Sequence, residues 1–332
     1  MRAIVIEEFG GPEVFREADV PRPAITDGHL LVKVAASSVN PVDYKVRAGL
    51  IPPITPAFPA VLGCDVAGVV EEIGADVTDF APGDEVYFCA GSPGGIGGAL
   101  AEFCLVDASQ VAKKPASLSF EQAAALPLVM ITAWDGLIDR AKVGAGMNVL
   151  VHGATGGVGH AGVQICKNAG ANVFATVSSD EKAAIASDLG ADVTINYREQ
   201  SVEEYVEEHT GGAGFDVVFD TVGGDNVATS IGAAALNGQV VSVNTRCECD
   251  LSPLHMRGLS LHVVFMLIPM FYDQPAGKAH HGEILRELAR SVDAGESKPL
   301  VHDEIFGFKD VGNAHALLEG GGAVGKVVLR GF

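Results

Sequence analysis

The chain reads Val149-Leu150-Val151-His152-Gly153-Ala154-Thr155-Gly156-Gly157-Val158-Gly159 where an apolar strand is expected to pass into a helix. The usual dinucleotide-binding fingerprint is G-x-G-x-x-G, and here Ala154 takes the first glycine position ahead of Gly156 and Gly159. Gly156 lets the backbone approach a pyrophosphate, and Gly159 lets the helix pack closely on the strand. Free N–H groups at the helix N-terminus favour an anion. The pattern predicts a dinucleotide site, with a structural turn lacking a ligand as the alternative. The expected contact residues in the turn are Ala154, Gly156, Gly157 and Val158.

Strands and helices alternate around this turn. Apolar strands separated by helices of about ten residues indicate βαβ units and a parallel sheet covered on both faces. The expected strands lie at 148–152, 172–177, 192–196, 215–220, 239–243 and 259–265, and the expected helices at 157–169, 180–189, 202–209 and 226–236.

The first 120 or so residues are β-rich instead. Short apolar runs are separated by glycine and proline clusters, which predicts a small barrel or sandwich. Residues 51–59 are expected to form an extended loop because of their prolines, and 91–98 a glycine-rich turn. A helix is expected after Ser119, another at 283–294, and a strand at 326–329. The α/β domain is therefore expected to be inserted into the β-rich one.

Composition excludes several classes of protein. The chain has 332 residues, 48% hydrophobic and 19% charged, which rules out disorder as the main state. Its 22 basic and 42 acidic residues give a net charge of −20, which opposes binding to nucleic acid or to an anionic membrane surface. Six scattered cysteines form no disulfide framework, and the N-terminus meets acid before any signal-peptide core, so a cytoplasmic protein is expected.

The end of the second strand bears on the choice of nicotinamide cofactor. An NAD site normally has Asp or Glu there, whereas this chain reads Thr176-Val177-Ser178-Ser179-Asp180-Glu181-Lys182. Hydroxyl groups and a lysine suit a 2′-phosphate, so NADPH is favoured over NADH. In the alternative, a serine only caps the next helix and Lys182 is solvated. Asp180 lies close enough to serve a ribose, which is the main objection.

Seven segments together resemble the medium-chain dehydrogenase/reductase superfamily, and within it the zinc-independent quinone oxidoreductases, most closely the alkenal/one oxidoreductase branch. The likeness covers nearly the whole chain, with the segments in the family's order. They are 40–45 (NPVDYK), 63–70 (GCDVAGVV), 83–87 (GDEVY), 126–128 (LPL) with 132–133 (TA), 153–159, 195–197 (INY) and 325–328 (GKVV).

The resemblance implies a fold and a set of cofactor contacts. The fold is α/β, with a GroES-like β-rich catalytic domain at 1–123 and 267–332 and an inserted Rossmann domain, a doubly wound parallel sheet, at 124–266. The cofactor is expected in the cleft between them, and a homodimer is expected through the strand at 259–265. Ser178, Lys182 and Tyr197 match contacts to the 2′-phosphate. Residues matching the region near the nicotinamide are Thr132, Val243, Asn244, Thr245 and Phe265.

The zinc ligands of the related alcohol dehydrogenases are not matched. Asn40 stands where the first cysteine would be, and Cys64-Asp65 replaces a His-Glu pair. The third position falls near Val129 and Met130, which are apolar. A catalytic zinc needs three protein ligands, so no catalytic zinc is expected. The four-cysteine lobe that holds a structural zinc in these dehydrogenases is absent as well, since only Cys89 and Cys104 lie in that stretch, so no structural zinc is expected either. Cys247 and Cys249 are interpreted as free thiols in a surface loop.

The segment 40–45 supplies the candidate catalytic residues. Reduction of a polarised C=C needs a hydrogen-bond donor near the carbonyl oxygen, and Tyr44 and Lys45 are the candidate donors. Asn40 and Asp43 are expected to orient the loop and the nicotinamide ribose. In the alternative, Tyr44 packs against the cofactor and Lys45 is solvated. A pocket wall of Ile51, Phe58 and Met130 would suit a small apolar substrate.

These residues predict an NADPH-dependent oxidoreductase that transfers hydride, without metal, to α,β-unsaturated carbonyls or quinones. An enone, quinone or aldehyde is the expected small-molecule partner, with no nucleic acid and no membrane. Three alternatives stay open: a carbonyl/alcohol oxidoreductase, an enoyl-thioester reductase and a non-catalytic NADPH-binding protein.

Overall fold

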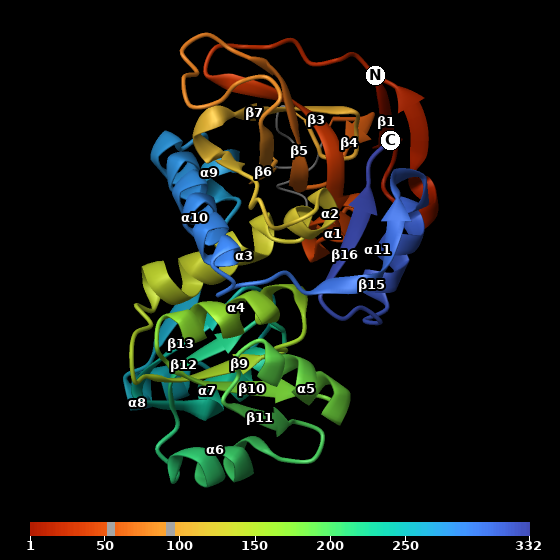
Figure 1. The fold of residues 1–332 in the computed structure, drawn as a ribbon. Helices are drawn as coiled ribbons and strands as arrows, with labels where there is room; N and C mark the ends of the chain where they lie inside the picture. The colour runs from red at the N-terminus through yellow and green to blue at the C-terminus, as the bar shows by residue number, and fades with distance from the viewer. Residues whose placement is uncertain (52–56, 91–96) are drawn as a thin grey trace. The chain divides into compact units, whose positions relative to one another are not determined.

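The computed structural model describes residues 1–51, 57–90 and 97–332 (Figure 1). They form two compact units. Unit 1 comprises Met1–Leu128, Leu267–Gly295 and Pro299–Phe332, and unit 2 comprises Val129–Met266 with Glu296–Lys298. Unit 2 is therefore inserted into the chain of unit 1. Within the described ranges, no helix combines the length and the apolar character needed to cross a bilayer.

Unit 2 is built on a six-stranded sheet in the order β11-β10-β9-β12-β13-β14. All its strand pairs are parallel. The order reverses beside β9, so the sheet is doubly wound, as the sequence predicts, and its switch point lies between β9 and β12. The strands are β9 (Asn148–His152), β10 (Asn172–Val177), β11 (Val193–Asn196), β12 (Phe215–Asp220), β13 (Ala234–Ser242) and β14 (Ser260–Val263).

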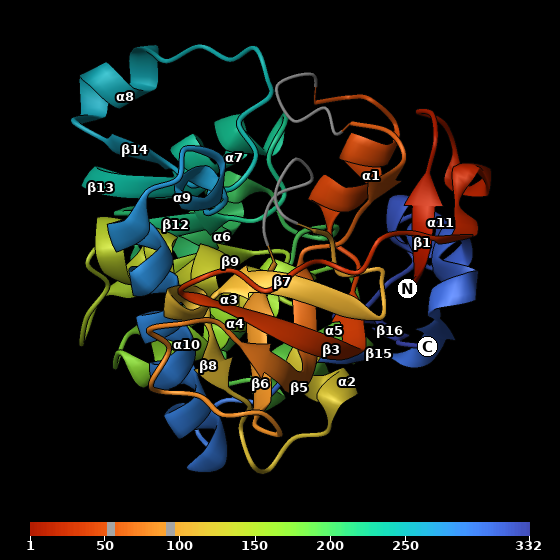
Figure 2. The ribbon, with the colours of Figure 1, turned by 90° about the horizontal axis from the view of Figure 1, so that it is seen from above.

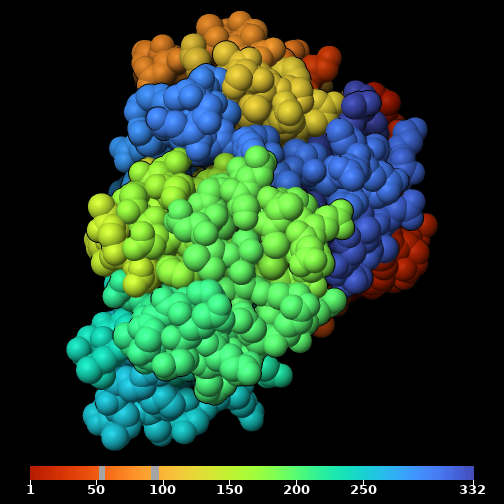
Figure 3. Space-filling model, turned by 60° about the horizontal axis from the view of Figure 1, so that its bottom comes forward, coloured from red at the N-terminus to blue at the C-terminus, as the bar shows by residue number. Residues whose placement is uncertain are grey.

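Helices cover this sheet. α4 and α5 pack on β9, β10 and β11, whereas α7 packs on β12 and β13. The acidic side chains of α6, such as Glu203 and Glu207, are exposed, and the helix belongs to the green surface seen in Figure 3. The helices are α3 (Pro127–Trp134, which begins in unit 1), a π-helix (Asp135–Arg140), α4 (Gly157–Asn168), α5 (Asp180–Asp188), α6 (Val202–Thr210), α7 (Asn226–Ala233) and α8 (Ser252–Arg257).

One predicted helix of unit 2 is wrong at its C-terminal end. The alanine-rich stretch suggests a helix over 226–236, but α7 ends at Ala233 and β13 begins at Ala234. Ala234 pairs with Phe215 before the register shifts, and Asn237 has a φ of 59°. Sheet pairing to a buried neighbour thus overrides the helix propensity of alanine.

Unit 1 contains two sheets. The smaller has the order β2-β1-β4, and the larger β15-β16-β3-β5-β6-β8, with β7 also paired to β3. The β-rich character predicted for this part of the chain is confirmed, although the predicted turn at 91–98 lies mostly outside the described residues. The strands are β1 (Arg2–Ile6), β2 (Arg16–Asp19), β3 (His29–Ser38), β4 (Ala60–Val61), β5 (Asp65–Ile73), β6 (Glu85–Cys89), β7 (Phe103–Asp107), β8 (Ala112–Lys113), β15 (Val301–Gly307) and β16 (Lys326–Arg330).

The helices of unit 1 pack around the larger sheet, where α2 contacts β3, β5 and β16. The two chain ends lie side by side (Figure 2), with the Arg2 guanidinium 4.5 Å from the centre of the Phe332 ring. The helices are α1 (Pro41–Arg47), α2 (Phe120–Ala124), α9 (Ile268–Phe271), α10 (Pro275–Asp293) and α11 (Val311–Glu319), and three 3₁₀ turns lie at Pro12–Val14, Ala108–Gln110 and Phe308–Asp310.

Candidate active site

Helix α1 carries Tyr44 and Lys45, the two candidate donors, and begins directly after β3. Asn40 is its N-cap residue in extended conformation, and Pro41 occupies the first turn. The Asp43 carboxylate accepts a hydrogen bond of 2.8 Å from the Asn40 N–H. A carboxylate in the first turn also suits the positive end of the helix. Asn40, Asp43, Tyr44 and Lys45 are thus brought to one helix start.

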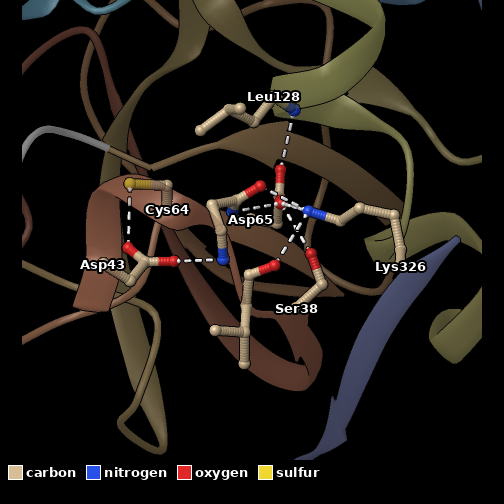
Figure 4. Close-up of polar contacts among 8 residues, drawn as sticks. Ser38, Asp43, Cys64, Asp65, Leu128 and Lys326 are labelled. Atoms are coloured by element: carbon tan, nitrogen blue, oxygen red, sulfur yellow. Dashed lines mark hydrogen bonds and ion pairs between the residues drawn. The ribbon is translucent and has the colours of Figure 1, made fainter. Parts of the chain in front are cut away.

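A buried polar cluster lies beside this helix start, centred on Asp65 of β5 (Figure 4). One carboxylate oxygen, Oδ2, accepts hydrogen bonds from Ser38 Oγ at 2.6 Å and Asn40 Nδ2 at 2.8 Å. The other, Oδ1, accepts from the Leu128 N–H at 2.7 Å. Asp65 is 0% exposed, and a buried charge of this kind requires compensation.

Lys326 of β16 supplies that compensation. Its ammonium lies 3.1 Å from Asp65 Oδ2, and its side chain is 3% exposed. It also donates to the Val39 carbonyl at 3.3 Å and to Asn40 Oδ1. The Asn40 amide therefore accepts from Lys326 and donates to Asp65, which fixes both ends of the amide.

The second carboxylate oxygen of Asp43, Oδ1, faces the Cys64 thiol. Cys64 Sγ donates to Asp43 Oδ1 at 3.4 Å. A hydrogen bond with Cys89, together with burial, raises the pKa of the Cys64 thiol, so it remains a donor. Burial raises the pKa of Asp43 to about 6, and the negative charge of Asp65 also raises it. The hydrogen bond from the Asn40 N–H and the positive charge of Lys326 lower the pKa and offset part of this rise.

We expect this raised pKa to make the stability depend on pH. Because the folded-state pKa of about 6 exceeds the ordinary aspartate value of 3.8, folding favours the protonated carboxyl. The stabilisation from Asp43 is complete below pH 3.8 and is lost as the pH rises through about 6. Asp43→Asn keeps an oxygen for the Asn40 N–H without the charge, and should gain about 1–2 kcal/mol at pH 8. Urea unfolding at pH 4 and pH 8 measures this, and an equal effect of the substitution at both values would contradict it.

Asn40 and Cys64-Asp65, which stand at the zinc positions of related dehydrogenases, lie together in unit 1. The Lys326 ammonium donates to both Asn40 and Asp65 there. Among the described residues, no group of three or more His, Cys, Asp or Glu side chains could hold a metal ion. Independence from zinc stays a prediction, which metal analysis of the protein tests. Cys247 and Cys249 are half-buried, with their sulfurs 4.0 Å apart.

The glycine-rich turn joins β9 to α4, at the carboxyl edge of the parallel sheet. A Cβ on Gly159 would lie 2.0 Å from the Gly153 carbonyl oxygen, and one on Gly156 3.2 Å from the same atom. Gly159 therefore needs to be glycine for the close approach of helix and turn, whereas a side chain at Gly156 would require the Gly153 carbonyl to shift by only a few tenths of an ångström. Ala154 is buried and donates its N–H to the Thr176 carbonyl of β10 at 3.3 Å.

The start of α4 differs from those of its neighbours α5 and α6. Ser179 Oγ caps α5 and Ser201 Oγ caps α6, each accepting a backbone N–H of the first turn. The cap residue of α4 is Gly156, which makes no side-chain cap. A helix start with N–H groups that no side chain caps binds anions. The turn thus fits the diphosphate of a dinucleotide.

Of the three residues predicted to contact a 2′-phosphate, two directly follow adjacent strands and the third lies in the first turn of a helix. Ser178 directly follows β10, and Lys182 is in the first turn of α5. Tyr197 directly follows β11, is 53% exposed, and its N–H donates to the Val177 carbonyl at 3.2 Å. The parallel register of Val177 with Asn196 therefore brings Ser178 and Tyr197 to one edge.

The residues predicted near the nicotinamide are more widely spread. Val243 follows β13, and its N–H donates to the Asp220 carbonyl at the end of β12. Asn244 and Thr245 continue that loop, Thr132 is buried in α3, and Phe265, which follows β14, is 40% exposed. The loop of Val243, Asn244 and Thr245 thus lies at the carboxyl edge of the parallel sheet. The roles of all five residues remain predictions.

Two buried charged residues, Asp220 in unit 2 and Lys326 in unit 1, are not among the site residues that the sequence predicts. Asp220 is 0% exposed and accepts from the Val222 and Gly223 N–H groups, from Asn226 and from Ser242 Oγ. Lys326 belongs to the family-like segment 325–328, which by itself assigns it no role. An isolated acidic or basic residue at a strand end was the only signal in the sequence for either of them.

Two family models match the chain. A model described as "Alcohol dehydrogenase GroES-like domain" covers residues 26–116, and one described as "Zinc-binding dehydrogenase" covers 157–274. The first lies in unit 1 and the second mostly in unit 2. The architecture is therefore a GroES-like domain with a Rossmann sheet, as expected.

Curated relatives and solved structures match over nearly the full length. The chain is 32% identical to a quinone oxidoreductase of Pongo abelii, covering 99% of this chain and 97% of the relative. It is 33% identical to an NADPH-dependent alkenal/one oxidoreductase of Arabidopsis thaliana, covering 99% and 79%. A solved alcohol dehydrogenase superfamily protein of Novosphingobium aromaticivorans is 40% identical, with a TM-score of 0.94 and 99% of both chains covered.

The chain belongs to the medium-chain dehydrogenase/reductase superfamily. Within it, the chain is an oxidoreductase similar to the quinone oxidoreductases. The chain is 32% identical to the quinone oxidoreductase and 33% identical to the alkenal/one oxidoreductase. These values do not distinguish the two branches, so the predicted preference for the alkenal/one branch is not supported.

Proposed function

We propose that the protein is an NADPH-dependent reductase of α,β-unsaturated carbonyls or quinones that works without zinc. The observation that carries the cofactor assignment is the glycine start of α4, which no side chain caps. It is joined by Ser178, at the end of the next strand, and by Lys182, in the first turn of α5. The substrate class is supported by the similarity to quinone and alkenal/one oxidoreductases over 99% of the chain.

The Rossmann residues hold the cofactor in this proposal. The α4 start and its turn bind the diphosphate, and Lys182 pairs with the 2′-phosphate through a charge-assisted hydrogen bond. When bound, the reduced nicotinamide supplies the hydride. Because the net charge of −20 opposes the approach of a phosphorylated cofactor, Lys182 supplies local positive charge at the 2′-phosphate.

The chain's own contribution to the reduction is a donor at the carbonyl oxygen of the substrate. Burial and the charge of Glu319 raise the pKa of Tyr44, so its phenol keeps its proton at neutral pH and can donate. Lys45, its neighbour on α1, adds positive charge that stabilises the developing enolate. Solvent then protonates the α-carbon, so no buried acid is required.

The test is NADPH oxidation with a panel of enones, quinones and saturated aldehydes, run beside NADH. We expect turnover of at least one enone or quinone and preference for NADPH. Good activity on saturated aldehydes with none on enones or quinones would reject the proposal and favour the alternative of a carbonyl/alcohol oxidoreductase. Tight NADPH binding with no consumption across the panel would indicate a non-catalytic binding protein.

A further inference from the structure

Lys326 joins segments that are far apart in the sequence. It lies at the start of β16 and reaches Val39 and Asn40 at the end of β3 and Asp65 at the start of β5. An ammonium group has three N–H donors, and here each has one acceptor: the Val39 carbonyl, Asn40 Oδ1 and Asp65 Oδ2. The direction of every donor is thereby set.

The main chain already ties β3 to β16, because the Val39 N–H donates to the Val327 carbonyl at 2.9 Å. What the Lys326 side chain adds is its contact with the Asn40 amide. That contact, with the bond from Asn40 Nδ2 to Asp65, holds the N-cap residue of α1 at both ends of its side chain. Asn40 in turn donates its backbone N–H to Asp43, in the first turn of the helix.

We infer that Lys326 is a positioning residue for the proposed reduction: through Asn40 it fixes the first turn of α1, and with it the orientation of Tyr44 and Lys45. Lys326 itself is 3% exposed and is not required to touch substrate or cofactor. The activity readout of this inference rests on the proposed function.

The alternative is that Lys326 only neutralises Asp65. A structural ion pair can be replaced by neutral residues of similar size with little loss, whereas a positioning residue cannot, because the Asn40 oxygen then lacks its donor. Comparing the single variant Lys326→Met with the double variant Asp65→Asn/Lys326→Met separates the two roles. Lys33→Met is the matched control, since Lys33 is exposed on β3 in the same unit.

Three quantities are measured on each variant: the Tm, the kcat with NADPH and an enone that the wild type reduces, and the Kd of NADPH. Lys326→Met should lower the Tm by about 10 °C, because it leaves Asp65 buried and unpaired. The double variant should recover most of that loss. In both, kcat should stay about 30-fold below wild type, because a small displacement of catalytic groups is costly, while the Kd changes less than about twofold.

Recovery of wild-type kcat in the double variant, or undiminished kcat in Lys326→Met, would overturn the inference. If Lys326→Met does not fold, the double variant is compared with Asp65→Asn alone, which makes the same change at Asp65 and keeps Lys326. A lower kcat in the double variant supports the inference, and equal kcat values overturn it. If the wild type reduces no enone or quinone, the proposed function fails by itself, and hydrogen exchange in α1 then decides. Amides of residues 44–50 should exchange about 10-fold faster in the double variant than in Lys33→Met, and equal protection would reject the role of Lys326.

Discussion

Gly159→Ala is expected to lower stability by about 3 kcal/mol and to weaken NADPH binding about 100-fold or more. Alanine ordinarily stabilises a helix interior relative to glycine by about 0.5–1 kcal/mol. Here the added Cβ would lie 2.0 Å from the Gly153 carbonyl oxygen and 3.0 Å from Ala154 Cα. Both are main-chain atoms of the turn itself, so relief requires moving the turn away from α4. Urea unfolding and calorimetric titration with NADPH measure the two effects.

The matched control is Gly232→Ala, in α7 of the same unit. A Cβ there would meet only Val202 Cγ1, at an ordinary 3.6 Å. This variant should be about 0.5 kcal/mol more stable than wild type and should bind NADPH unchanged. If Gly159→Ala binds NADPH within threefold of wild type, the turn does not hold the diphosphate.

The Rossmann unit was predictable because its signals are local. A strand, a glycine turn and a helix follow one another within about 20 residues, and the chain repeats the alternation of strand and helix. The position of the glycine-rich turn between β9 and α4 could therefore be predicted from the sequence, whereas the contacts of its residues with a cofactor stay a prediction. The end of α7 was mispredicted because pairing between Ala234 and Phe215 is a long-range effect that alanine propensity does not carry.

The polar cluster of unit 1 was only half predictable. Asn40 and Asp43 could be found because they belong to the segment 40–45 that resembles the family, although the helix that this segment starts was not predicted. Lys326 could not be linked to Asp65 from spacing, because 261 residues separate them and only sheet pairing of β16, β3 and β5 brings them together. Helix α10 begins at Pro275, earlier than the expected residue 283, because its first turns are polar and show no apolar period.

Lys182→Ala is expected to raise the Kd of NADPH about 100-fold and to change the Kd of NADH less than about threefold. A charge-assisted hydrogen bond to phosphate contributes about 1.5–3 kcal/mol, and about 1.4 kcal/mol corresponds to each tenfold change in Kd. NADH lacks the 2′-phosphate, so it loses nothing. The backbone N–H of Lys182, which donates to Ser179 Oγ at 3.4 Å, is kept in the variant, so the cap of α5 survives.

The control for this prediction is Lys298→Ala. Lys298 belongs to the same unit and pairs with Asp188 at the opposite end of α5, where its side chain is 51% exposed. Its removal deletes a positive charge near the same helix and should leave both Kd values unchanged. Fluorescence titrations of NADPH and NADH at two salt concentrations measure the effect, because screening should weaken NADPH binding more in wild type than in Lys182→Ala. Equal losses of affinity for NADPH and NADH would mean that Lys182 does not contact the 2′-phosphate. If the Kd values of both cofactors stay unaltered, Asp180, on the same turn, is left as the residue that selects the ribose.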